Sequence, residues 1–96
     1  MRLSFRVSGS VQGVGYRWFV KETAGKHSVT GWVRNAQDGS VEGEAQGGVP
    51  ELDGFLKELK TGHPWAAVEK AETQEMLDQE SPERESGKDF YIKPTV

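Results

Sequence analysis

The sequence predicts an α+β sandwich in which two helices cover one face of an antiparallel sheet, with the element order βαββαβ and a short fifth strand. Three observations lead to this prediction. Several short segments alternate apolar and polar residues, as half-buried strands do, and two others carry apolar residues at helical spacing. Turns that contain glycine or proline separate these segments. Because crossovers between parallel strands are right-handed, both helices are expected on the same face.

The first strand and the first helix are predicted because the spacing of apolar residues changes from strict alternation to helical spacing. Leu3, Phe5 and Val7 alternate with polar residues, which is typical of a half-buried strand. A helix is expected from about Tyr16 to Lys26, where apolar residues follow helical spacing. Its inner stripe consists of Tyr16, Phe19, Val20, Thr23 and Ala24. The glycine-rich segment between the two elements is therefore expected to turn a strand into a helix.

A hairpin is predicted next. Residues 28–36 form one strand of it and residues 40–46 the strand that returns. The turn contains Asp38 and Gly39, a pair that favours hairpins. The side chains expected to face the helices are those of Val29, Gly31, Val33, Asn35, Val41, Gly43 and Ala45. Asn35 comes at the end of its strand, next to the final residue Ala36, where a core gives way to a cleft.

A second helix follows the hairpin. Pro50 stands near its first position, where the missing amide proton costs little, and Gly62 ends it. The apolar stripe consists of Leu52, Phe55, Leu56 and Leu59. Trp65 follows shortly after and is expected to close one end of the core.

The C-terminal part predicts two strands. Residues 67–77 alternate irregularly, and a bulge near Glu69 and Lys70 would restore one apolar face. Residues 78–87 are polar and charged, so a mobile loop is expected there before a short strand with Phe90 and Ile92. The complete order is that of a ferredoxin-like fold, which does not by itself imply a function.

Composition limits the possible functions. The chain has 96 residues, which predicts one domain over 1–96. It has no cysteine, so disulfides and thiolate chemistry are excluded. A net charge of −3 gives no general attraction to nucleic acid or to anionic membranes. We see neither a signal peptide nor an apolar run long enough to span a membrane, and we expect a cytoplasmic monomer.

The candidate functional site is the glycine-rich turn. It reads Gly9-Ser10-Val11-Gln12-Gly13-Val14-Gly15-Tyr16-Arg17. Glycines let the backbone turn closely, and the first amides of the following helix point outward without partners. These amides and the helix dipole favour an anion, and a guanidinium can bind two phosphate oxygens at once. The turn therefore predicts a site for a phosphoryl group, although it matches neither the P-loop nor the dinucleotide pattern.

Structural alternatives remain open at this point. Arg17 can instead be a surface arginine whose stem covers the helix. Asn35 can be a turn-entry residue that satisfies nearby backbone groups. However, Asn35 shares the face that the helix of Arg17 covers, so the two side chains are expected to converge. The two histidines, His27 and His63, stand in no metal-ligand spacing, and we expect neither a metal nor a cofactor.

The glycine-rich turn resembles the signature loop of the acylphosphatases. A second segment resembles the other signature of that family: Gly31-Trp32-Val33-Arg34-Asn35-Ala36-Gln37-Asp38-Gly39-Ser40-Val41-Glu42. The two occur in the family's order with a helix between them, and the likeness covers nearly the whole chain. It implies a ferredoxin-like fold and hydrolysis of acyl phosphates to carboxylate and inorganic phosphate.

The resemblance also implies roles for individual residues. Arg17 would bind the substrate phosphate together with the backbone amides of Gln12, Gly13, Val14, Gly15 and Tyr16, and Asn35 would be the catalytic asparagine that orients the attacking water. His27 departs from the family pattern, which favours an apolar residue there. Because a buried imidazolium is unfavourable, we expect modest acid sensitivity between about pH 5 and 7.

Two other functions remain as alternatives. The chain could be a small binding module that uses the loop to sense an anion without turning it over. It could also bind nucleic acid through the open face of the sheet, with Trp32 and Tyr91 as stacking platforms, although its acidic balance disfavours this. Phosphate release from an acyl phosphate separates the enzyme from both alternatives.

Overall fold

The computed structural model describes residues 1–76 and 89–95. The elements follow one another as β1 (Arg2–Ser10), α1 (Tyr16–Lys26), β2 (Thr30–Asn35), β3 (Val41–Gln46), α2 (Val49–Thr61), β4 (Ala67–Met76) and β5 (Phe90–Ile92). The predicted element order is confirmed, and both helices begin and end where the sequence places them. The mobile loop expected at residues 78–87 lies outside the described residues. Neither α1 nor α2, the helices of the described ranges, is long and apolar enough to cross a membrane.

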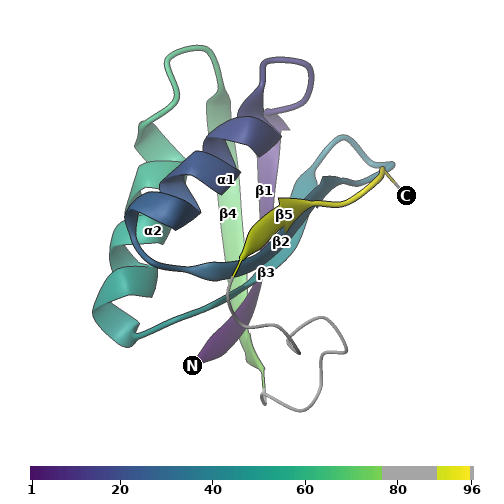
Figure 1. Cartoon of the computed structure of the whole chain (residues 1–96). Helices are drawn as coiled ribbons and strands as arrows, with labels where there is room; N and C mark the ends of the chain where they lie inside the picture. The colour runs from purple at the N-terminus through teal and green to yellow at the C-terminus, as the bar shows by residue number, and fades with distance from the viewer. Residues whose placement is uncertain (77–88, 96) are drawn as a thin grey trace.

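The strands form one sheet in the order β4-β1-β3-β2-β5, and both helices lie on one of its faces (Figure 1). Neighbouring strands are antiparallel, except that β5 runs parallel to β2. Strand β5 begins at the end of the sheet where β4 finishes, so it runs opposite to β4, as β2 does. The fold is the predicted ferredoxin-like sandwich, with a mixed sheet at its β5 edge.

The bulge predicted near Glu69 and Lys70 lies at Glu69. Ser8 of β1 pairs with Lys70, but the next residue, Gly9, pairs with Val68. Glu69 is thus the extra residue on β4, and it shifts the alternation of side chains by one position. This explains why the apolar residues of β4 do not keep one parity.

The core lies between the sheet and the two helices. Phe55 of α2 is fully buried and contacts the rings of Phe5 and Phe90, with centroids 5.8 and 5.9 Å away. The prediction for Trp65 was wrong, because this side chain is 77% exposed. Its amide nitrogen and that of the next residue donate to Nδ1 of His63, which folds a local turn. The His63 ring, and not Trp65, packs against the aromatic residues at the start of α1.

His27 connects the two helices through a polar contact. Its Nε2 lies 2.7 Å from Oε1 of Glu58 on α2, and its side chain is 24% exposed. A charged imidazolium at this position therefore has a carboxylate partner and access to solvent. The acid sensitivity expected of His27 assumed a buried cation without a partner, and the structure does not show one. Within this pair, the Glu58 carboxyl has a lowered pKa.

Glu58→Gln is expected to change how stability depends on pH. The hydrogen bond from His27, followed by that from Lys26, lowers the pKa of the Glu58 carboxyl. A carboxyl whose pKa is lower in the folded state adds stability above its unfolded pKa of about 4.3, and this is lost as the pH falls through the folded pKa. The unfolding free energy of the wild type should exceed that of the variant above pH ~5 and approach it below pH ~4.

Urea unfolding at a series of pH values measures this difference. Asp53→Asn is a suitable control, because it removes the same charge on the same helix from an ion pair with Lys57 whose side chains are 62% and 74% exposed. A constant gap between wild type and Glu58→Gln from pH 3.5 to 7 would contradict the assignment.

Candidate active site

The turn between β1 and α1 has the backbone of an anion-binding loop. Gly13 and Gly15 have φ angles of 79° and 75°, in the left-handed region that side chains disfavour. A Cβ on either glycine would meet nothing within 4 Å, so the backbone conformation, and not lack of space, requires glycine here. Gly15 is the N-cap of α1 and has no side chain to cap it. The first amides of α1 thus remain available at the helix N-terminus.

A cavity of about 220 Å³ lies at this helix N-terminus. Its walls come from the loop, from the first turn of α1, and from the ends of β2 and β5. The lining residues are Val11, Gly13, Gly15, Tyr16, Arg17, Trp18, Asn35 and Ile92. Arg17 and Asn35, which the sequence predicted to converge from separate elements, therefore line the same cavity. The helix N-terminus and the guanidinium both favour an anion in it.

Asn35 has an unsatisfied acceptor at this cavity. Its Oδ1 is buried and accepts no hydrogen bond from any residue that the structure describes. The hairpin turn is satisfied without it, because the amide and hydroxyl of Ser40 donate to Oδ1 of Asp38 at 2.9 and 2.6 Å. The Ala36 amide also donates to the Ser40 carbonyl at 2.9 Å. Asp38, and not Asn35, therefore satisfies the backbone groups of the turn. The Asn35 Oδ1 is left without a hydrogen-bond donor from the described residues.

Asp38 is a structural carboxylate. The hydrogen bond from the Ser40 hydroxyl, with a second from the Ser40 amide, lowers the pKa of the Asp38 carboxyl. Its Oδ2 also lies 2.7 Å from the guanidinium of Arg6, on the open face of the sheet. This carboxylate stays ionised and holds the turn that follows Asn35.

The side chains of two predicted loop residues make structural contacts with the rest of the fold. Nε2 of Gln12 donates to the carbonyls of Ala36 and Ser40, both at 2.9 Å. This side chain therefore ties the loop to the hairpin that carries Asn35. Val14 is partly buried and packs against the core. Sequence reasoning gave both residues only a backbone role. A long amide side chain among small loop residues was the signal that could have identified the role of Gln12.

Tyr16 joins the cavity to the helix layer. Its side chain is 1% exposed, and its hydroxyl donates to the carbonyl of Leu59 at 2.6 Å. Leu59 lies in the last turn of α2, where carbonyls have no intrahelical partner. Burial strongly raises the pKa of the Tyr16 hydroxyl, so it remains a donor. The residue that opens α1 thus also caps α2.

Tyr16→Phe is expected to lower the free energy of unfolding by about 1–3 kcal/mol. The substitution keeps the ring but leaves the Leu59 carbonyl buried without its donor, which carries the full desolvation cost of that group. Urea unfolding of wild type and variant measures the loss. Phe19→Leu, which changes a neighbouring ring without touching this hydrogen bond, controls for altered packing. An unchanged midpoint in Tyr16→Phe would show that the hydrogen bond contributes nothing net.

Outside the glycine-rich turn, sequence reasoning missed two residues of the cavity wall. Trp18 is 58% exposed, and its place on the wall was not foreseen. Ile92 was assigned only to a short strand. It reaches the cavity because it pairs with Val33 in the parallel register of β5 on β2. That register depends on residues distant in the sequence, so no local pattern could have revealed it.

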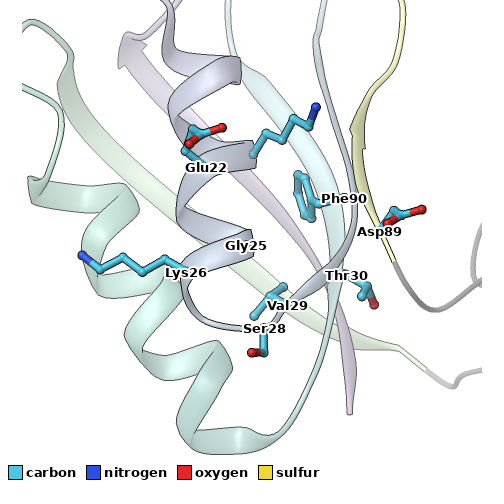
Figure 2. A pocket seen from close by; sticks show the side chains of 9 residues that line it. Glu22, Gly25, Lys26, Ser28, Val29, Thr30, Asp89 and Phe90 are labelled. Carbon is cyan, nitrogen blue, oxygen red and sulfur yellow. The ribbon is translucent and has the colours of Figure 1, made fainter.

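A larger cavity, of about 730 Å³, lies at the other end of α1 (Figure 2). It is bordered by the last turns of α1, the start of β2, and Asp89 and Phe90 (Figure 2). Its charged groups are of both signs, and Lys26 extends away from Asp89 toward α2, where it pairs with Glu58 at 3.0 Å. The buried side-chain atoms without a partner, within the described ranges, lie on Trp32 and Asn35 and not on this wall. The smaller cavity is therefore the better candidate.

The described part of the chain brings together no group of three or more His, Cys, Asp or Glu side chains that could hold a metal ion.

Comparisons with known proteins identify the family of this fold. The family model of the acylphosphatases matches residues 3–92. An acylphosphatase of Bacillus licheniformis is 48% identical over 69 residues, covering 72% of this chain and 77% of that relative. An acylphosphatase of Clostridium acetobutylicum is 37% identical over 91 residues, covering 95% of this chain and 94% of the relative.

The solved structures include a similar acylphosphatase from Bacillus subtilis. It superposes with a TM-score of 0.84 at 35% identity, covering 96% of this chain and 97% of that chain. From the family model, the relatives and this structure together, the chain belongs to the acylphosphatase family.

Proposed function

We propose that this chain hydrolyses acyl phosphates in the cavity at the N-terminus of α1, without a metal ion. Arg17 and the amides of the loop from Gln12 to Tyr16 would bind the phosphoryl group, and Asn35 would position the attacking water. The observation that carries this proposal is that the buried, unpaired Oδ1 belongs to a side chain that lines the same cavity as the Arg17 guanidinium. One side chain can bind an anion, and the other lacks the donor that a water supplies.

The chemistry suits a site with so few groups. Water attacks phosphorus, the bond between phosphorus and the bridging oxygen breaks, and the bonding electrons leave with the carboxylate. The balance is RCO–OPO₃²⁻ + H₂O → RCOO⁻ + H₂PO₄⁻. A carboxylate is a stable leaving group, so strong acid catalysis is unnecessary. The protein has to orient the phosphoryl group, stabilise its spreading charge and place the water in line.

Each proposed group matches one of these tasks. The guanidinium of Arg17 has a planar set of donors that fits two phosphoryl oxygens. The free amides and the dipole of α1 add positive potential at the same point. The Asn35 carboxamide can accept a hydrogen bond from water through Oδ1 and donate one to the phosphoryl group through Nδ2. It orients the water and need not remove its proton before attack.

The proposal is tested by measuring inorganic phosphate released from acetyl phosphate by the purified chain, with and without excess EDTA. Release above the spontaneous rate that EDTA leaves unchanged is the expected result. Release that EDTA abolishes would refute metal independence. Phosphate that binds to the loop while acetyl phosphate stays intact would refute the enzyme and favour the anion-binding module.

The open face of the sheet gives little support to nucleic-acid binding. Trp32 is 7% exposed, and Arg34 and Lys93 lie over its ring at 4.9 and 4.6 Å from the centroid. A base would have to displace these cations to stack on the indole. We further propose that residues 1–96 form one domain of this type. A monomeric state and a cytoplasmic location stay predictions.

A further inference from the structure

We propose that Trp18 and Ile92 form the subsite for the acyl group and select acyl phosphates whose acyl group is flat and apolar. The inference rests on the proposed function, because it names the part of the substrate that the phosphoryl-binding groups do not hold. Its starting point is that both side chains line the same cavity as Arg17 and Asn35 and are mostly apolar, the indole N–H of Trp18 being their only polar group.

The size of the cavity determines where the acyl group lies. Sites that enclose a drug-sized ligand usually measure ~300–1,000 Å³. The cavity here, at about 220 Å³, is smaller. A phosphoryl group and the carbonyl next to it can enter, whereas a larger acyl group has to extend past the rim. Its surroundings are then the exposed side chains on the cavity wall.

Those residues are apolar and largely exposed. Trp18 is 58% exposed and Ile92 is 37% exposed, so both leave apolar surface open to solvent beside the cavity. Trp18 comes from the first turn of α1, directly after Arg17, and Ile92 comes from the strand at the sheet edge. They thus border the cavity from two elements, and an apolar group placed between them would remove apolar surface from water.

The Trp18 ring and the backbone of Ile92 both make local contacts. The ammonium group of Lys21, one turn along α1, lies over the Trp18 ring at 5.1 Å from its centroid. Ile92 pairs with Val33 across the parallel strands, and the amide of the next residue donates to the Val33 carbonyl at 2.9 Å. An aromatic acyl group can stack against the indole, whose contact with Lys21 limits the side-chain freedom lost on binding.

The test compares kcat/KM for benzoyl phosphate and acetyl phosphate in wild type, Trp18→Ala, Trp18→Phe and Ile92→Ala. The ratio of the two values is the readout, since it cancels changes in phosphoryl binding or in the fraction of folded protein. In Trp18→Ala the benzoyl-to-acetyl ratio should fall about two- to tenfold, the range that an aromatic contact supplies. Trp18→Phe should restore most of it, and Ile92→Ala should lower it less.

Trp65→Ala is the matched control, because Trp65 is also an exposed tryptophan, at 77%, but is not part of the cavity wall. Its ratio should equal that of the wild type. An unchanged ratio in Trp18→Ala and Ile92→Ala, with both substrates still hydrolysed, would overturn the inference and leave the proposed function intact. Failure of the wild type to hydrolyse either substrate would instead overturn the proposed function.

Discussion

Replacing Arg17 by lysine or by alanine is expected to lower kcat/KM for acetyl phosphate by about ten- to a hundredfold or more. A charged hydrogen bond contributes roughly 1.5–3 kcal/mol, and each ~1.4 kcal/mol corresponds to a factor of ten in rate. Lysine keeps the positive charge but loses the planar pair of donors that fits two phosphoryl oxygens. If the guanidinium geometry matters, lysine will resemble alanine more than it resembles the wild type.

Arg6→Lys provides the control for an arginine-to-lysine change. Arg6 lies on the open face of the sheet, 43% exposed, where it pairs with Asp38 and Glu42. It should retain wild-type kcat/KM. If Arg17→Lys also retains full kcat/KM while Arg17→Ala loses it, charge alone is sufficient and bidentate binding is wrong. If both Arg17 variants keep full activity, the phosphoryl group binds elsewhere.

Asn35→Ala is expected to lower kcat by about a hundredfold while phosphate binding and folding persist. Loss of one preorganised group that acts in the transition state costs roughly 10²–10³ in kcat. The structure adds a second, distinctive expectation. Because Oδ1 of Asn35 is buried without a donor from the described residues, its removal breaks no hydrogen bond and eliminates a desolvated acceptor. The free energy of unfolding should therefore stay unchanged or rise slightly.

Asp38→Ala in the same hairpin is the matched comparison. Asp38 accepts hydrogen bonds from the amide and the hydroxyl of Ser40, so its removal should lower stability and leave most of the turnover. Steady-state kinetics, phosphate titration and urea unfolding of the two variants measure the three quantities. Equal kcat for Asn35→Ala and wild type would eliminate the catalytic role. A marked loss of stability in Asn35→Ala would return this residue to a structural role in the turn.

The predictable part of the fold depends on local patterns. The bounds of α1 follow from the helical spacing of its apolar residues, and the bulge at Glu69 follows from the broken alternation of β4. The meeting of Arg17 and Asn35 was predictable too, because strand parity and one crossover place them on the same face. Each of these inferences needs only the residue spacing within a short segment, or the rule that crossovers between parallel strands are right-handed.

The parts that sequence reasoning missed depend on contacts between distant segments. Trp65 looked like a core residue, but His63 bonds to the local backbone and occupies the packing position beside α1. From the sequence, His27 looked like a misplaced polar residue, but in the structure it contacts Glu58 of α2, which is distant in the sequence. Ile92 reaches the cavity only through the register of a three-residue strand. Alternation and composition do not specify such pairings, since many partners would suit each side chain equally well.

The hydrogen bond from Tyr16 to Leu59 has a consequence for motion. Glycine-rich surface loops commonly open on their own, at little cost compared with unfolding the whole domain. Opening this loop would draw the tyrosine out and uncap the last turn of α2, so the loop and the helices should exchange amide hydrogens as one cooperative unit. If the loop binds a phosphoryl group as we propose, this coupling keeps the loop in its binding conformation beforehand, and little conformational entropy is lost on binding.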